Sequence, residues 1–297
     1  LSYKNNPFVN PIETSARHLK HGALVIDKGL IVDVGEKNHI LKKFPNSEII
    51  DYQDHLITAG FIDCHMHYPQ TQIIASYGKR LLDWLNNFTF PEEMKFSDIK
   101  YASKIASMTL DLCLANGTTT LASYCTIHPE SVDVFFYEAE KRKMSVIAGK
   151  TCMDRNAPKN LLDTPKSAYV DSEKLIKKWH NNGRAIYAIS PRFAPTSSPE
   201  QLEILGDLWK SHPDCLMQTH ISEQKEEMDW VQKLFPNSKD YLDVYERFNL
   251  IGEGAVFGHA VHLNLRERKR ILETKSAIAH CPTSNMFIGS GIFDLQG

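Results

Sequence analysis

The chain has 297 residues, of which 42% are hydrophobic and 24% are charged. These are ordinary values for a globular protein, and they exclude a disordered, collagen-like or coiled-coil chain. The 34 Lys and Arg residues nearly balance 36 Asp and Glu residues, for a formal charge of −2, so no global electric field favours nucleic acid or an anionic membrane. The length suits two ordinary domains, or one α/β barrel that uses nearly the whole chain.

The composition and termini predict a soluble, cytoplasmic protein. No apolar run approaches the roughly 20 residues that a membrane helix needs, and residues 1–11 lack the basic and apolar segments of a secretion signal. The six cysteines lie apart, without a Cys-x-x-Cys pair, as expected of buried thiols in a reducing compartment. Because the chain begins with Leu1 and residues 289–297 form no closing element, we expect both ends to be cut.

The first part of the chain carries short β-type runs at residues 22–26, 29–34 and 48–50, separated by Asp, Gly and Pro-Asn turn residues. This pattern predicts a small antiparallel β unit. We expect residues 1–57 to be an N-terminal β segment that belongs to a composite β-sandwich domain, and residues 58–297 to be a second domain.

After Gly60 the pattern changes, because short apolar runs alternate with amphipathic stretches of helix length. This alternation is typical of β/α repeats around a parallel sheet. A closed barrel of this kind needs eight strands, and seven are visible, so we expect a (β/α)8 TIM-like barrel whose eighth strand lies beyond Gly297. The predicted strands are residues 61–67, 118–124, 144–150, 185–193, 215–221, 255–260 and 277–281.

Several helices between these strands have side chains suited to cap their first turn. The predicted caps and helices are Asp98 before 99–115, Ser198 before 201–210, Ser222 before 223–234, and Asn264 before 265–273.

The side chains at the C-terminal ends of barrel strands face the active site of a β/α barrel. His65 and His67 end the first strand, and because side chains alternate along a strand, their imidazoles point the same way. That spacing suits two ligands of one metal, although an isolated His-x-His more often marks two polar residues at a strand end. Asp63 shares their face, where it could orient an imidazole or act as a simple cap.

Two further strands end in histidine. His220 ends the fifth strand, Glu223 follows at the start of the next helix, and His259 ends the sixth strand. Four imidazoles on one rim are improbable by chance, and neutral imidazole is the usual ligand of zinc and also suits iron. A metal lowers the pKa of its bound water, and Glu223 could carry the released proton to a leaving nitrogen. The sequence therefore predicts metal-assisted hydrolysis.

Two segments suggest that the substrate is flat and polar. Arg192 and Phe193 follow the fourth strand; a guanidinium offers a planar fork of donors, and a phenyl ring packs against another ring. A surface arginine beside a core phenylalanine explains the same residues equally well when they are taken alone. Gln70, three residues after His67, carries both a donor and an acceptor and suits the edge of a heterocycle.

The stretch at residues 59–67, AGFIDCHMH, resembles the first-strand motif of the amidohydrolase superfamily, and His220, Glu223 and His259 fall where the deaminases of that family have theirs. The resemblance runs from about Gly22 to the last residue. Within the family, the guanine-deaminating members are similar at residues 67–70, 82–85, 89–92, 116–120, 150–156, 191–193 and 281–285.

This resemblance implies hydrolysis of guanine to xanthine and ammonia in purine catabolism. It also implies one divalent metal, which is usually zinc and for which iron is the alternative. The family's further metal-associated Asp, in a Gly-Thr-Asp motif of the eighth strand, is absent here, and we expect it beyond Gly297. When the family's roles are carried over to this sequence, the metal ligands would be His65, His67 and His220. Glu223 would be the proton shuttle, and His259 would be the partner of the metal-bound water. The residues that bind the purine would be Gln70, Arg192 and Phe193.

Two alternatives stay open. A related amidohydrolase could deaminate another aminated ring, such as 8-oxoguanine or a triazine, with the same metal site. A barrel of a different class would be a metal-free scaffold for assembly or binding, against which the intact ligand positions argue. The expected partners are a small purine and water, with neither nucleic acid nor membrane, and the expected assembly is a homodimer.

Overall fold

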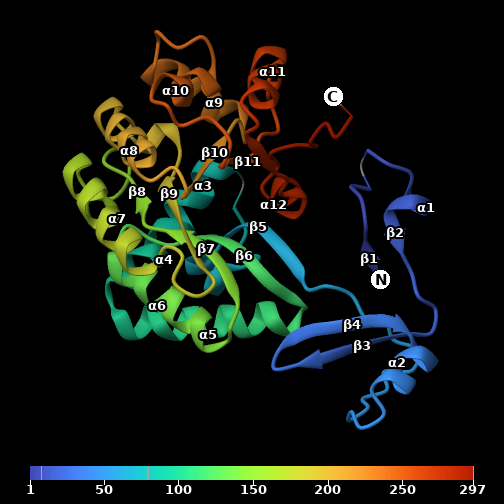
Figure 1. Ribbon diagram of the computed structural model, residues 1–297. Coiled ribbons are helices and arrows are strands. Elements are labelled where there is room, and N and C mark those ends of the chain that lie inside the picture. Colours follow the sequence, from blue (N-terminus) through green and yellow to red (C-terminus); the bar gives the residue numbers. More distant parts are fainter. Residues whose placement is uncertain (8, 79, 297) are drawn as a thin grey trace. The chain divides into compact units, whose positions relative to one another are not determined.

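The computed structural model describes residues 1–7, 9–78 and 80–296, and the chain forms two compact units, Leu1–Gly60 and Phe61–Gly297 (Figure 1). In the first unit, β1 (Ser2–Tyr3) pairs antiparallel with β2 (Ala16–Arg17), and the short helix α1 (Ile12–Ser15) precedes β2.

The first unit also contains an antiparallel hairpin of β3 (Gly22–Asp27) and β4 (Leu30–Glu36), followed by α2 (Lys37–Lys43). Lys28 and Gly29 join the two strands with φ values of 49° and 80°, the positive values that a tight hairpin turn requires. The predicted strands at 22–26 and 29–34 are therefore confirmed.

The predicted strand at residues 48–50 is wrong, because this segment has no regular secondary structure. Ile49 and Ile50 are largely exposed, and none of the described strands pairs with them. A short apolar run becomes a strand only where a neighbouring strand takes up its backbone hydrogen bonds.

The second unit is built on a parallel sheet whose strands follow one another in the order β5-β6-β7-β9-β10-β11-β12, with β8 paired to β9. The seven predicted strands are confirmed, with small differences at their ends. The strands are β5 (Phe61–His67), β6 (Thr118–Tyr124), β7 (Ser145–Gly149), β8 (Thr151–Cys152), β9 (Ala185–Pro191), β10 (Leu216–Ile221), β11 (Ala255–His259) and β12 (Ala277–Ala279).

The sheet curls into a nearly closed barrel. The side chain of His65 on β5 reaches Gly258 of β11, so that a Cβ atom added to Gly258 would lie only 2.4 Å from Cε1 of His65. Glycine at this position leaves the space that the His65 ring occupies inside the barrel. The TIM-like fold predicted from the β/α alternation is thereby confirmed.

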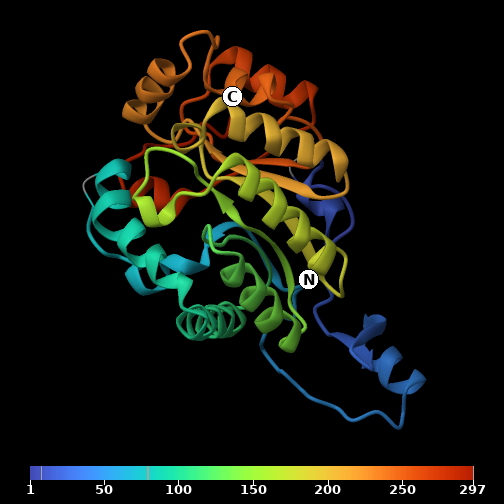
Figure 2. The ribbon, with the colours of Figure 1, turned by 90° about the vertical axis from the view of Figure 1, so that its left-hand side faces the viewer.

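Helices surround the sheet of the second unit (Figure 2). None of the helices in the described part of the chain is long and apolar enough to cross a membrane. The main helices are α5 (Ile99–Ala115), α6 (Pro129–Lys141), α7 (Pro165–Trp179), α8 (Pro199–Ser211), α9 (Lys225–Leu234), α10 (Tyr241–Arg247) and α11 (Leu265–Glu273).

Shorter helices lie in the connections between these elements. They are η1 (Tyr68–Ile73), α3 (Leu81–Trp84), η2 (Leu85–Thr89), α4 (Phe90–Glu93), η3 (Met94–Ser97), η4 (Lys159–Leu161), η5 (Ala194–Thr196) and α12 (Pro282–Phe287).

Three of the four predicted helix caps are confirmed: the side chains of Asp98, Ser198 and Asn264 accept hydrogen bonds from the first turns of α5, α8 and α11. The fourth is wrong. Helix α9 begins after Gln224, which forms a capping box with Glu227. Glu223 therefore lies in the loop between β10 and α9 and not at the start of the helix.

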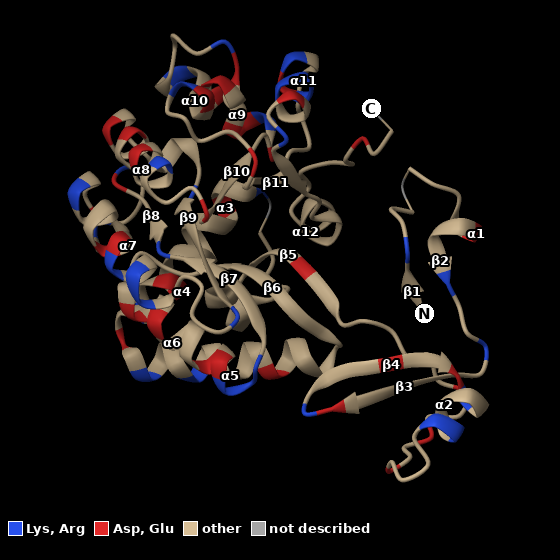
Figure 3. Ribbon diagram, viewed as in Figure 1, with Lys and Arg blue, Asp and Glu red and all other residues tan. Residues whose placement is uncertain are grey.

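The core lies between the sheet and its helices, where side chains such as Leu121, Val146 and Phe257 from the strands pack in one cluster with Phe135 and Leu205 from the helices. Charged residues of both signs are spread over the helices, while the strands of the second unit are mostly uncharged (Figure 3). This distribution agrees with the near-zero net charge.

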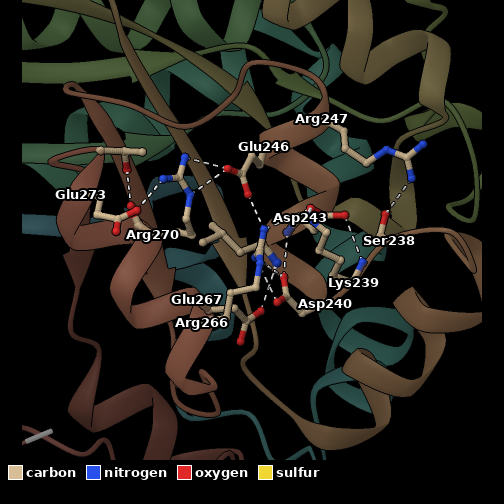
Figure 4. A network of polar contacts seen from close by, with 12 residues as sticks. Ser238, Lys239, Asp240, Asp243, Glu246, Arg247, Arg266, Glu267, Arg270 and Glu273 are labelled. Carbon is tan, nitrogen blue, oxygen red and sulfur yellow. Dashed lines mark hydrogen bonds and ion pairs between the residues drawn. The ribbon is translucent and has the colours of Figure 1, made fainter.

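An ion-pair network joins α10 to α11 (Figure 4). Arg266 contacts Asp240 at 2.8 Å and Asp243 at 3.1 Å, and also pairs with Glu246. Arg270 adds a second contact to Glu246, at 2.7 Å. Because neither aspartate side chain exceeds 9% exposure, this network keeps nearly buried carboxylates paired.

Candidate active site

A cavity of about 700 Å³ lies at the C-terminal ends of the barrel strands. Parallel strands direct their C-terminal ends to one rim, which brings together side chains that are far apart in the sequence. All the site residues predicted from the sequence line this cavity: His65, His67, Gln70, Arg192, Phe193, His220, Glu223 and His259.

Four imidazole rings cluster in this cavity. The ring of His65 lies 5.4 Å from that of His67, 4.8 Å from that of His220 and 5.0 Å from that of His259, between ring centroids. The Nε2 atoms of His67 and His220 are 2.9 Å apart, and one ligand atom each from His65, His220 and His259 lies within 4.8 Å of the others. The structure thus brings His259 as close to the cluster as the three predicted ligands.

Second partners fix which nitrogen of two of these rings carries the proton. Nδ1 of His220 lies 2.6 Å from the carbonyl oxygen of Arg192, which can only accept, so His220 is protonated at Nδ1. Nδ1 of His259 lies 2.8 Å from the side-chain oxygen of Asn285, with the same consequence. Both rings therefore keep an unprotonated Nε2, as a metal ligand requires.

The cluster fits a divalent metal. Nε2 of His65 and Nδ1 of His67 are buried and have no hydrogen-bond partner among the described residues, an unfavourable state for a polar atom in a protein interior. Burial holds the pKa values of His65, His67 and His220 well below their usual range. The rings are neutral, the form that binds zinc or iron.

Glu223 lies beside the imidazole cluster, with its Oε1 atom 3.3 Å from Nδ1 of His259. The side chain is only 3% exposed, and burial raises its pKa to about 8. A carboxyl group whose pKa lies near the working pH can both take up and release a proton. Ser222 turns the chain directly before this residue, with a φ of 48°.

Two of the proposed purine-binding side chains, Arg192 and Phe193, are held by residues on the side away from the cavity. Nη1 of Arg192 donates to Oε2 of Glu93 at 2.6 Å, and the Arg192 guanidinium lies 5.5 Å from the centre of the Phe90 ring. Arg192 is buried, so the alternative of a surface arginine is wrong. Phe193 both lines the cavity and packs in a small apolar cluster with Phe90.

Residues 56–297 match the Amidohydrolase family. The chain belongs to the amidohydrolase family. It is 46% identical over 286 residues to guanine deaminase of Escherichia coli K12, an alignment that covers 96% of this chain and 65% of that protein. The chain thus spans about two thirds of the length of this relative.

Solved structures of the family agree with this assignment. Guanine deaminase from Bradyrhizobium japonicum shares 41% identity at a TM-score of 0.96, over 99% of this chain and 64% of that one. A guanine deaminase from C. acetobutylicum with guanine bound in its active site shares 33% identity at a TM-score of 0.84, over 91% and 64%. A triazine hydrolase at 19% identity and a TM-score of 0.84 shares the fold.

The structure adds residues to this amidohydrolase site that sequence reasoning did not single out. Asn285, which contacts His259, lies inside the segment 281–285 that carries the family resemblance, so a signal for it was present. Glu93 and Glu227 carry no comparable signal, because each lies in a short helix-forming run beside another glutamate.

A second group of possible ligands, His180, Asp214 and Cys215, is not a comparable metal site. Nε2 of His180 contacts Asp214 at 3.0 Å, and Nδ1 accepts a hydrogen bond from the backbone N–H of Tyr187 at 3.1 Å. Both nitrogens of the ring are thus engaged within the protein.

Proposed function

We propose that this amidohydrolase catalyses the hydrolytic deamination of guanine to xanthine and ammonia. The observation that carries the proposal is that the imidazole cluster, Glu223 and the side chains of Arg192 and Gln70 all line the same cavity. The similarity to guanine deaminases, one of them with guanine in its active site, supports the choice of substrate.

His65, His67 and His220 would hold one divalent metal, with zinc as our proposal and iron as the alternative. When bound, the metal supplies Lewis-acid activation of water. Glu223 accepts a proton from the attacking water and delivers it to the ring nitrogen beside the aminated carbon as the carbon–oxygen bond forms. The second proton of that water then passes to the amino nitrogen, so that the carbon–nitrogen bond breaks, ammonia leaves and the new carbonyl of xanthine forms. His259 orients the water beside Glu223.

The purine is held by groups that match its edge. The remaining N–H groups of Arg192 donate to the ring carbonyl oxygen, and the side-chain oxygen of Gln70 accepts from a ring N–H. Phe193 contacts the flat ring. These interactions place the aminated carbon of guanine against Glu223, which is the orientation that the reaction needs.

Ammonia release from guanine by the purified, metal-loaded protein tests the proposal. We expect xanthine and ammonia in equal amounts, with much slower release from 8-oxoguanine, melamine, adenine and cytosine. Rapid turnover of one of these rings without turnover of guanine would reject guanine as the substrate. A protein that takes up no metal when metal is offered, and that turns over none of these rings, would favour the scaffold alternative.

We further propose a cytoplasmic homodimer that serves purine catabolism and in which residues 1–57 contribute to a composite β-sandwich. The free thiol state of all six cysteines supports a reducing compartment. The exposed apolar side chains of Ile26, Leu30 and Ile31 on the β3–β4 hairpin support a covering partner for that segment. Metal analysis of the purified protein identifies the bound metal, and analytical sedimentation shows whether the protein is a dimer.

A further inference from the structure

Glu93 lies behind the purine-binding wall of the cavity. It is the last residue of α4 and its side chain is fully buried. Its Oε2 atom accepts a hydrogen bond from Nη1 of Arg192 at 2.6 Å, and its Oε1 atom accepts one from Nε2 of Gln70 at 3.3 Å. One carboxylate thus holds two side chains that line the cavity, one after β9 and one in η1.

The contact with Arg192 sets the direction of its donors. A guanidinium is planar and carries its N–H groups in a rigid fork. With Nη1 on Glu93 and Phe90 within 5.5 Å of the guanidinium carbon, the remaining N–H groups have set directions. The side chain therefore presents donors, and no acceptor, to the substrate.

The contact with Gln70 sets the orientation of an amide that could otherwise turn over. An ionised carboxylate only accepts hydrogen bonds, so the NH₂ group of Gln70 is held toward Glu93. The amide oxygen of Gln70 is then directed away from Glu93 and is able to accept a hydrogen bond from a ligand. Without the carboxylate, either end of the amide could face the substrate with similar energy.

We propose that Glu93 is a positioning residue that sets the donor and acceptor pattern of the purine-binding wall. Through Arg192 it presents donors to a ring carbonyl, and through Gln70 it presents an acceptor to a ring N–H. The wall then selects a lactam edge, in which a carbonyl adjoins an N–H, over an unsubstituted or aminated edge. This inference rests on the proposed function, because it concerns the wall that would hold guanine.

A purely structural role for Glu93 makes a different prediction. Arg192 is buried and needs a counter-ion, so loss of Glu93 would lower stability in either case. Only the positioning role changes the preference for one ring edge over another. Selectivity is therefore the deciding measurement, and stability is not.

The test compares binding of hypoxanthine, which has a carbonyl beside an N–H, with binding of purine, which has neither group on that edge. Titration calorimetry on the metal-loaded full-length protein gives both affinities without turnover. We expect Glu93→Gln to weaken hypoxanthine binding about tenfold or more, the size of one lost hydrogen bond to a charged group, and purine binding less than about twofold. The hypoxanthine-to-purine affinity ratio should fall accordingly.

Glu92→Gln is the matched control. Glu92 is also a nearly buried glutamate of α4, but its carboxylate pairs with Tyr101 and with Lys95, not with the cavity wall. We expect this variant to keep the wild-type affinity ratio. A folded Glu93→Gln protein with the wild-type ratio would overturn the inference, as would an equal loss of selectivity in Glu92→Gln.

A double variant tests whether Glu93 acts through Arg192. In an Arg192→Met background, Glu93→Gln should lower hypoxanthine affinity by a smaller factor than in the wild type, because only the contact with Gln70 is left to lose. The double variant should melt above Arg192→Met, because no unpaired carboxylate stays buried. A further tenfold loss in this background would contradict action through Arg192. If Glu93→Gln does not fold, Glu93→Asp serves in its place, because it keeps the negative charge but moves it back by one methylene. We expect the same fall in the hypoxanthine-to-purine affinity ratio. An unchanged affinity ratio in Glu93→Asp would overturn the inference.

These measurements separate the inference from the proposed function. A protein that prefers hypoxanthine to purine through Glu93, yet releases no ammonia from guanine, would contradict the proposed reaction and leave the inference standing. If instead the protein deaminates guanine, and Glu93→Gln leaves the hypoxanthine-to-purine affinity ratio unaltered, the proposed function stands and the inference about Glu93 is overturned.

Discussion

The carboxylate of Glu227 accepts a hydrogen bond from the backbone N–H of Glu223 at 2.9 Å. The same oxygen accepts from the backbone N–H of Gln224 at 3.1 Å, and the other oxygen accepts from the hydroxyl of Tyr241 at 2.7 Å. One buried side chain on α9 therefore ties the loop that carries Glu223 to α10. The position of the proposed proton shuttle depends on a residue that does not touch the substrate cavity.

We expect Glu227→Ala to lower kcat at least tenfold without loss of bound metal, because the backbone of Glu223 loses its anchor. Stability should fall as well, by about 1–3 kcal/mol for each buried donor left without a partner. Thermal unfolding, metal content and guanine turnover measure these effects together. Glu226→Ala is the control, since that side chain is half exposed and pairs with Arg80 at the surface. Wild-type kcat in Glu227→Ala would contradict the anchoring role.

Glu223→Gln should reduce turnover by about 10²–10⁴-fold, because an amide cannot carry the proton that general acid–base catalysis requires. The change in volume is small, so the bound metal and the affinity for hypoxanthine should stay near their wild-type values. Stopped assays of ammonia release give kcat, and calorimetry gives the affinity. A variant that turns over guanine at the wild-type rate would exclude Glu223 as the shuttle.

Removal of the metal by a chelator should abolish activity and lower the melting temperature, and added zinc should restore both. A ligand that binds only the folded state stabilises it by about 2.7 kcal/mol at a hundredfold excess over its Kd. We expect His220→Ala to lose the zinc-induced rise in melting temperature. His180→Ala should keep that rise, because both nitrogens of His180 already have partners outside the cavity. Equal zinc responses in the two variants would count against the imidazole cluster as the metal site.

Arg266→Gln should destabilise the protein by about 1–2 kcal/mol at low salt, because Asp240 and Asp243 lose a partner while their side chains stay nearly buried. The difference from wild type should shrink only in part at 1 M salt, because surface charges are then screened within about 3 Å whereas nearly buried pairs are screened much less. Denaturant unfolding measures both values. Lys269→Gln is the control, since its contact to Glu273 is 3.7 Å long and exposed, and it should change stability by less than about 0.5 kcal/mol. A salt-independent effect of Arg266→Gln would point to lost packing.

Local patterns of the sequence predicted the elements well where the structure uses local contacts. The caps at Asp98, Ser198 and Asn264 are confirmed because a cap joins a side chain to a backbone N–H only two or three residues away. The cap at Ser222 is wrong because Gln224 forms a box with Glu227 instead. Two candidate caps within three residues compete, and the local pattern does not decide between them.

By itself, the sequence determined the β/α barrel and the convergence of His65, His67, His220 and His259, because parallel strands bring their C-terminal ends to one rim whatever the length of the connections. Only the tertiary structure decided which groups hold these side chains in place. The partner of Arg192 is Glu93, 99 residues away, and the anchor of Glu223 also binds Tyr241 from another helix. Such contacts depend on how helices pack against the sheet, and no periodicity or spacing in a single chain records that packing.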